Sequence, residues 1–235
     1  MSYPLVRRLS TLAIRTRASV LSTPLAACFA LGLVVTAAVM AVLPDDDQLS
    51  IARAASTNIT HLAIDPFFVL PASAFVDLGN VWLWVPLTLI LVGGLERKLG
   101  PGRALMIGFG AHVIATVISE GMLLLLIAWH AAPRSDVDVL DVGPSYVILA
   151  VMAACLILGS WKLRLAAVLS GAIVIPGLLV GITGLDMSAL GHLSSLILGT
   201  LFALAFTERG RRWIASHRRP LPKPALVVLR KPVTV

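Results

Sequence analysis

The sequence has few charged side chains and almost no cysteine for a chain of 235 residues. Charged residues make up 13% of it and apolar residues 58%, and the mean hydropathy is +0.93. A globular domain of this size needs more polar surface to stay in solution, so the composition excludes a soluble protein. The two cysteines, Cys28 and Cys155, both lie in apolar stretches, which excludes a disulfide scaffold and a cysteine-ligated metal centre.

Long apolar runs predict an all-α membrane protein. A run of about 20 apolar residues is enough for one helix to cross the hydrocarbon core of a bilayer. Six such runs are present, at 24–43, 78–95, 104–129, 143–161, 165–185 and 187–207. The sequence therefore predicts a six-helix membrane domain over residues 21–207. Charges and prolines interrupt the apolar stretch 58–77, so we expect an interfacial loop segment there rather than a crossing.

The distribution of lysine and arginine predicts the orientation. If all six runs cross, 17 of the 19 basic residues fall on one side, and only Arg53 and Arg134 fall on the other. Since basic loops stay in the cytoplasm, both termini are predicted to be cytoplasmic, with a basic tail at 1–20 and a basic, proline-containing tail at 208–235. The net charge of +7 thus reflects topology. The expected partner is the lipid bilayer, and no nucleic acid is expected.

Arginine outnumbers lysine 15 to 4, and alanine and valine are abundant, which is typical of a GC-rich bacterial genome. The expected location is therefore the inner (cytoplasmic) membrane of a bacterial cell.

Ser145 and His192 are the first candidates for chemistry, because polar side chains inside a span are costly and often functional. Ser145 lies 17 residues before Lys162, and His192 lies 17 residues before Arg209. At a rise of about 1.5 Å per residue, both lie about 25 Å from the cytoplasmic charges. Equal depth on two helices that run the same way predicts a serine–histidine pair, in which the imidazole takes the hydroxyl proton.

The residues around this pair support the same chemistry. Gly143 and Pro144 open the fourth run, and the free N–H groups of a helix start can stabilise a developing oxyanion. Gly191, Ser195 and Gly199 form a stripe of small residues along the sixth run. Such a stripe lets a neighbouring helix approach closely, as a pair of side chains on two helices requires.

The third run carries His112, Thr116 and Glu120, which are spaced four residues apart and share one helical face. Two interpretations remain open. The three side chains could support the site, on the oxyanion side or by orienting His192, or they could form a buried polar packing seam. Asp138 and Asp141, in the loop before the serine, are expected to be solvated.

These motifs resemble the rhomboid family of intramembrane serine proteases over about residues 58–207. The family's pattern at the end of its second helix matches Gly93-Gly94-Leu95-Glu96-Arg97-Lys98-Leu99-Gly100. Its Gly-x-Ser-Gly nucleophile motif corresponds to Gly143-Pro144-Ser145-Tyr146, and its histidine motif to Gly191-His192 with Ser195 and Gly199. The resemblance implies a six-helix bundle, Ser145 as nucleophile, His192 as general base, no metal or cofactor, and a single-pass membrane protein as substrate.

The sequence departs from the family pattern at four positions. Tyr146 replaces the second glycine and is expected to crowd the nucleophile, and Leu149 replaces an aromatic residue. Val81 and Val85 occupy the places of a histidine and an asparagine that help to hold the oxyanion. These departures favour an alternative, a catalytically inactive rhomboid-like protein that binds client transmembrane helices. A small transporter is a third alternative, but the two halves of the sequence show no repeat.

Overall fold

The computed structural model describes residues 22–79, 81–209 and 212, and every regular element in that part of the chain is helical. The prediction of an all-α protein is therefore confirmed. The predicted N-terminal tail (1–20) and the C-terminal tail from 213 onward lie outside the described residues.

The α-helices, in chain order, form the apolar runs and the segment that joins the first run to the second. They are α2 (Pro24–Met40), α3 (Asp45–Ala55), α4 (Ile59–Ile64), α5 (Pro66–Ser73), α6 (Val81–Leu87), α7 (Gly93–Leu99), α8 (Pro101–Leu105), α9 (Ala111–Ala128), α10 (Ser145–Leu158), α11 (Trp161–Leu178) and α12 (Met187–Phe206). Single π-helical turns join α6 to α7 (η1, Thr88–Val92) and α8 to α9 (η2, Met106–Gly110).

In the described part of the chain, three helices are long and apolar enough to cross a membrane: Pro101–Ala128, Trp161–Leu178 and Met187–Phe206. Two apolar helices, α2 and α10, are shorter. α10 has only 14 residues, so it is about 21 Å long and shorter than the hydrocarbon core. All its residues from 146 to 155 are buried, so α10 is the centre of the bundle rather than a lipid-facing helix.

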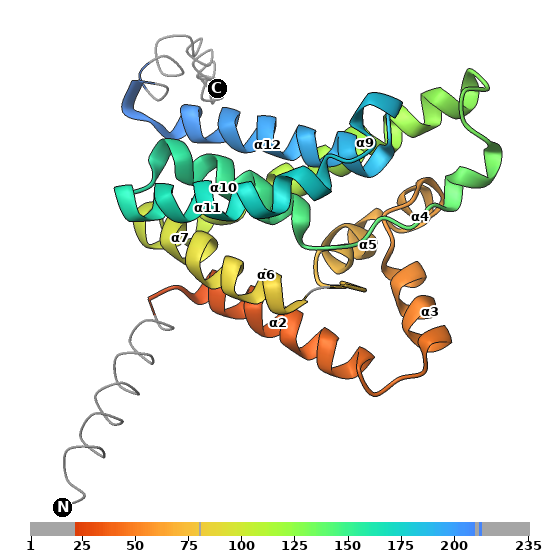
Figure 1. Cartoon of the computed structure of the whole chain (residues 1–235), viewed down its shortest axis with the longest axis horizontal. Coiled ribbons are helices and arrows are strands. Elements are labelled where there is room, and N and C mark those ends of the chain that lie inside the picture. The colour runs from red at the N-terminus through yellow and green to blue at the C-terminus, as the bar shows by residue number, and fades with distance from the viewer. Residues whose placement is uncertain (1–21, 80, 210–211, 213–235) are drawn as a thin grey trace, which may run out of the picture.

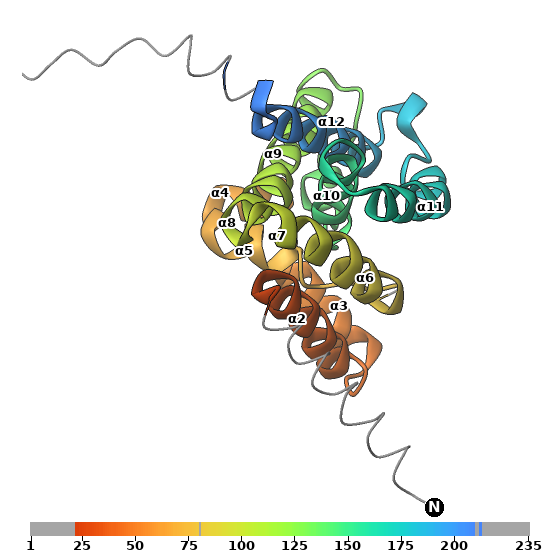
Figure 2. The same ribbon diagram turned by 90° about the vertical axis from the view of Figure 1, so that its left-hand side faces the viewer.

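The other helices surround α10. It packs most extensively against α12 and also contacts α11, α9 and the helix formed by α6, η1 and α7 (Figure 2). α2 lies beyond α6, on the side away from α12 (Figure 1). Along α9 two buried residues alternate with two exposed ones, and the exposed side carries Val113, Ile114, Val117 and Ile118. An apolar exposed face of this kind is suited to contact with lipid tails.

Glu96 is a buried acidic residue that directly precedes the basic Arg97 and Lys98 near the end of α7. Its two carboxylate oxygens accept hydrogen bonds from the backbone N–H groups of Leu25 and Ala26, both at 2.9 Å. These N–H groups belong to the first turn of α2 and have no acceptor within the helix. The buried carboxylate therefore caps α2, and its negative charge interacts favourably with the partial positive charge at the N-terminus of this helix.

Basic side chains gather at one end of the bundle and contact helix ends there. Lys98 donates to the Leu158 carbonyl, and Arg164 donates to the Ile157 carbonyl at 2.8 Å, so both stabilise the C-terminus of α10. The guanidinium of Arg103 lies 5.8 Å from the ring of Phe206 near the end of α12. One end of the bundle therefore contains the connections from α7 to α8 and from α10 to α11, together with the C-terminus of α12.

The opposite end carries α3, α4 and α5 (Figure 1). The interfacial segment predicted at 58–77 contains α4 and α5, each less than three turns long. The preceding helix α3 was not predicted, because its sequence is polar rather than apolar. Three aspartates, at 45, 46 and 47, occupy its first turn, where negative charge favours a helix start.

The observed helices begin or end several residues away from some predicted limits. The first run was predicted to reach 43, but α2 ends at Met40, and the second was predicted over 78–95, but its helix extends from Val81 to Leu99. The fourth run was predicted to begin at Gly143, but α10 begins at Ser145. The fifth was predicted to extend to Leu185, but α11 ends at Leu178. Gly181 and Leu185 adopt positive φ angles of 88° and 59°, so the chain turns here although its residues remain apolar.

Candidate active site

The first residue of α10 contacts a histidine in the second turn of α12. The Oγ atom of Ser145 lies 2.9 Å from Nε2 of His192, which is a hydrogen-bonding distance. The histidine is 5% exposed and the serine is half-buried, so the pair lies just below the molecular surface.

A backbone carbonyl sets the orientation of the imidazole. Nδ1 of His192 lies 2.8 Å from the carbonyl oxygen of Leu178. A carbonyl can only accept, so Nδ1 carries the proton in the neutral ring and Nε2 presents its lone pair to the Ser145 hydroxyl. Leu178 ends α11, where the last carbonyls have no N–H donor within the helix, so the His192 contact also satisfies this acceptor. A backbone atom has no sequence signature, and sequence analysis missed it.

The small residues of α12 bring this helix against α10. A Cβ atom at Gly199 would lie 2.1 Å from the carbonyl oxygen of Ala150 and 2.6 Å from its Cα, so the two backbones touch here. Gly191 and Ser195 are also buried, and Gly191 packs against the Tyr146 ring. The predicted stripe therefore faces α10, which holds His192 at the depth of Ser145.

Gly143 turns the chain into α10. Its φ angle of 136° is one that side-chain-bearing residues rarely adopt. Its N–H donates to the carbonyl of Ser73 at 2.8 Å, so α5 holds the turn in place. The N–H groups of the following first turn of α10 have no intrahelical acceptor and lie beside the Ser145 hydroxyl.

The sequence model of a family described as Rhomboid-like protein matches residues 19–212. This chain belongs to the rhomboid-like protein family. The resemblance drawn from its glycine-rich, serine and histidine motifs is confirmed, and the rhomboid-like chain is a membrane protein. No curated protein and no solved structure matches it.

In this rhomboid-like protein the loop before Ser145 packs on the linker between α3 and α4. The backbone N–H of Asp141 donates to the Ser56 hydroxyl at 2.9 Å. The Thr57 N–H and hydroxyl donate to the Asp141 carbonyl and carboxylate at 3.0 and 3.1 Å. The prediction that Asp141 is solvated was wrong, since only 8% of it is exposed. Asp138 accepts from the Thr60 hydroxyl at 2.7 Å on the exposed side of the same loop.

Burial makes the Asp141 carboxyl a source of pH dependence. Burial raises its pKa to about 6, and the Thr57 hydrogen bond opposes this only in part. The folded state thus holds the proton more tightly than the unfolded state, so this group stabilises the fold below about pH 4 and loses that contribution as the pH rises through 6.

Asp141→Asn is expected to raise the free energy of unfolding by about 2–3 kcal/mol above pH 7, because a neutral amide avoids the cost of burying charge, about 1.4 kcal/mol per pKa unit. The thermal unfolding midpoint in detergent, measured from pH 4 to 8, should fall with pH for the wild type and stay flatter for the variant. Asp138→Asn is the matched control and should leave the wild-type slope unchanged. A variant that is less stable than the wild type at pH 8 would contradict this prediction.

Tyr146, which was expected to crowd the backbone beside Ser145, has its ring between α9 and α12. Its ring is buried, lies 5.8 Å from the His112 ring, and meets the His192 ring edge-on at 5.0 Å between centroids. The large side chain therefore fills the space between α9, α10 and α12 and supports one face of the His192 imidazole.

The stripe on α9 is buried, as the interpretation of a polar packing seam expects. Nε2 of His112 lies 2.9 Å from the Leu70 carbonyl and 3.1 Å from the Ser73 hydroxyl, so this histidine holds α5 beneath Gly143. Thr116 and Glu120 are buried, and their side-chain oxygens have no hydrogen-bond partner among the described residues. The Leu178 carbonyl, and not the stripe, is the group that orients His192.

Val81 and Val85 lie on α6 and pack against the hydrophobic core. Neither side chain can donate a hydrogen bond, so any oxyanion site must use backbone donors or other side chains. Within the described residues, no group of three or more His, Cys, Asp or Glu side chains is arranged to hold a metal ion.

Proposed function

We propose that this rhomboid-like protein is an intramembrane serine endopeptidase that cleaves the transmembrane helices of membrane proteins. Ser145 is the nucleophile and His192 the general base. The observation that carries the proposal is the 2.9 Å contact between Oγ and Nε2, with Nδ1 held by the Leu178 carbonyl. A packing contact needs no defined tautomer, whereas a general base does.

The reaction follows from this arrangement. As Oγ bonds to the scissile carbonyl carbon, its proton passes to Nε2 of His192. The imidazolium then donates that proton to the leaving amine as the peptide C–N bond breaks, which leaves an ester on Ser145. A water molecule, deprotonated by the same imidazole, attacks the ester carbon. The ester C–O bond to Oγ then breaks, the imidazolium returns the proton to Oγ of Ser145, and the new carboxyl end is released. The substrate helix must unwind locally first, because its carbonyls are engaged in helical hydrogen bonds.

Two helix ends favour the charges that develop in this reaction. The N-terminus of α10 presents backbone N–H groups and a partial positive charge toward the oxyanion at Ser145. The C-terminus of α11 presents the Leu178 carbonyl and a partial negative charge toward the imidazolium of His192. The site therefore has electrostatic stabilisation for both charges without a metal ion.

The proposal includes six crossings of a bacterial inner membrane with both termini in the cytoplasm, a membrane domain over 21–207, and cytoplasmic tails at 1–20 and 208–235. The basic end of the bundle would face the cytoplasm, in accordance with the positive-inside rule. The active site then lies toward the outer face, near α4 and α5. Because α10 is only about 21 Å long, its first residue Ser145 would lie within the bilayer and not at its outer surface, which suits cleavage inside the membrane.

A second candidate function is the retention of client transmembrane helices without cleavage. Val81 and Val85 favour it. They occupy the places of the histidine and asparagine side chains that help to hold the oxyanion in the proteolytic rhomboids that this chain resembles. Removing one such donor costs an enzyme about 10²–10³-fold in rate. Catalysis by this chain would therefore depend more on the backbone N–H groups of α10.

A fluorophosphonate probe distinguishes the two functions, because it reacts with activated serines only. We expect the purified protein to form a covalent adduct at Ser145, located by peptide mass spectrometry, and to cleave a reporter that carries one transmembrane helix. Ser194→Ala, on the same helix as His192, is the control and should keep both activities. An unlabelled Ser145 together with an intact, bound reporter would indicate the binding protein instead.

A further inference from the structure

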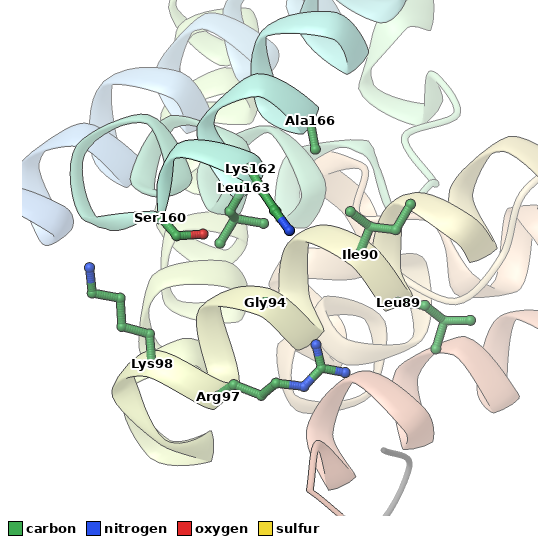
Figure 3. Close-up of a pocket in the computed structure, with 9 residues that line it drawn as sticks. All are labelled: Leu89, Ile90, Gly94, Arg97, Lys98, Ser160, Lys162, Leu163 and Ala166. Carbon is green, nitrogen blue, oxygen red and sulfur yellow. The ribbon is translucent and has the colours of Figure 1, made fainter. Parts of the chain in front are cut away.

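A groove of about 610 Å³ lies between α11 and the helix formed by η1 and α7, at the basic end of the bundle (Figure 3). It is separate from Ser145 and His192, neither of which lines it. Arg97, Lys98 and Lys162 line the groove together with the hydroxyl-bearing Ser160. Its remaining wall is apolar and includes Leu89, Ile90 and Leu163.

The charge at the groove is of one sign. None of the described side chains that line it is acidic. The nearby Glu96 points to the start of α2, where both of its oxygens accept backbone hydrogen bonds. Lys98 donates to the Leu158 carbonyl, but an ammonium group has three protons to donate. Lys162 extends from α11 past the ring of Trp161, with its Nζ 5.7 Å from the ring centroid. The site is therefore complementary to an anion.

The apolar wall continues the groove away from these charges. Leu89 is 44% exposed and Ile90 is 51% exposed, so both leave apolar surface uncovered. They precede Arg97 by about two turns of the same helix, away from its basic end. Leu163 forms the floor, where it packs against Gly94. A ligand that fills the groove must therefore be anionic at one end and apolar at the other.

We propose that this groove binds one anionic phospholipid. The phosphate would interact with Arg97 and Lys162, with Lys98 adding positive charge at the rim, and an acyl chain would lie along Leu89, Ile90 and Leu163. A free phosphate ion would leave the apolar wall uncovered, and an apolar client helix would bring no anion to the basic side chains that line the groove. Basic pockets between transmembrane helices on the cytoplasmic side are suited to such head groups. This inference does not depend on peptidase activity.

Lipid binding should be measured on the purified, delipidated protein by native mass spectrometry and by thermal unfolding in a neutral detergent. We expect phosphatidylglycerol to bind and to raise the unfolding midpoint, and phosphatidylcholine with the same acyl chains to do neither. Glycerol 3-phosphate, which carries the charge without the chain, should not reproduce the stabilisation. The double variant Arg97→Gln/Lys162→Gln should bind phosphatidylglycerol about 30-fold more weakly, since each basic group contributes about fivefold.

Arg103→Gln is the matched control, because Arg103 lies at the same end of the bundle but contacts Phe206 rather than the groove. It should keep wild-type lipid affinity. If the double variant does not fold, Lys162→Gln alone, at an exposed position, should still bind about fivefold more weakly. Equal binding of the two lipids, unchanged affinity in the groove variants, or an equal loss in Arg103→Gln would overturn the proposal.

Discussion

Replacing either Ser145 or His192 with alanine is expected to reduce cleavage of a transmembrane reporter by about 10⁴–10⁶-fold. Without the hydroxyl no acyl-enzyme forms, and without the imidazole the hydroxyl at 2.9 Å keeps its proton and remains a weak nucleophile. Residues that act as one unit are not additive, so the double variant should lose no more than the single ones. The measurement is the initial cleavage rate in proteoliposomes that contain a fixed ratio of enzyme to reporter.

The stability of these variants separates catalysis from folding. Ser145→Ala removes only a half-buried hydroxyl, so its thermal unfolding midpoint should remain within a few degrees of the wild type. His192→Ala also leaves the Leu178 carbonyl without its partner, so its midpoint should fall further, and its activity should be measured well below that temperature. Ser194→Ala serves again as the control and should cleave at the wild-type rate. Cleavage that persists in Ser145→Ala, or a loss of less than tenfold in His192→Ala, would show that these side chains do not perform the reaction.

Gly199→Ala is expected to affect both the fold and the activity. The added methyl group would meet backbone atoms of Ala150 at 2.1 and 2.6 Å, and backbone cannot move aside as a side chain can. Overpacking of this kind destabilises a protein by about 1–3 kcal/mol. The two helices must separate, and α12 carries His192 away from Ser145 on α10. Because a displacement of about 1 Å can cost about 100-fold in rate, cleavage should fall by that order.

Gly121→Ala provides the matched control for this substitution. Gly121 lies inside the helix α9, and a Cβ atom there would meet nothing within 4 Å. Alanine is favoured over glycine in a helix interior, so this variant should be as stable as the wild type or slightly more stable. Both variants should be compared by thermal unfolding and reporter cleavage. A fully active and stable Gly199→Ala would mean that α10 and α12 are not held by this contact.

The sequence was most informative where one physical requirement acts along the chain. A helix in a bilayer needs an apolar run, so the third and sixth runs correspond closely to Pro101–Ala128 and Met187–Phe206. Helix rise is constant, so counting from Lys162 and Arg209 placed Ser145 and His192 at one depth. The spacing of Gly191, Ser195 and Gly199 likewise indicated which face of α12 meets its neighbour.

Contacts between distant segments were not predictable in the same way. Asp141 was expected to be solvated because it lies in an acidic loop, but hydrogen bonds with Ser56 and Thr57 bury it. Tyr146 was expected to crowd the nucleophile because it follows Ser145, but its side chain points between α9 and α12. In both cases the neighbours come from segments distant in the sequence, and a single sequence does not say which segments pack together.

The sequence by itself determined the membrane class, the apolar helices and the level at which a hydroxyl and an imidazole lie, because these follow from hydropathy and from the fixed rise of a helix. Only the tertiary structure decided that α12 lies directly against α10, that the Leu178 carbonyl holds the ring of His192, and that Arg97, Lys98 and Lys162 face one groove. These arrangements depend on which helix faces meet and on backbone atoms that every residue possesses, so no side-chain pattern encodes them locally.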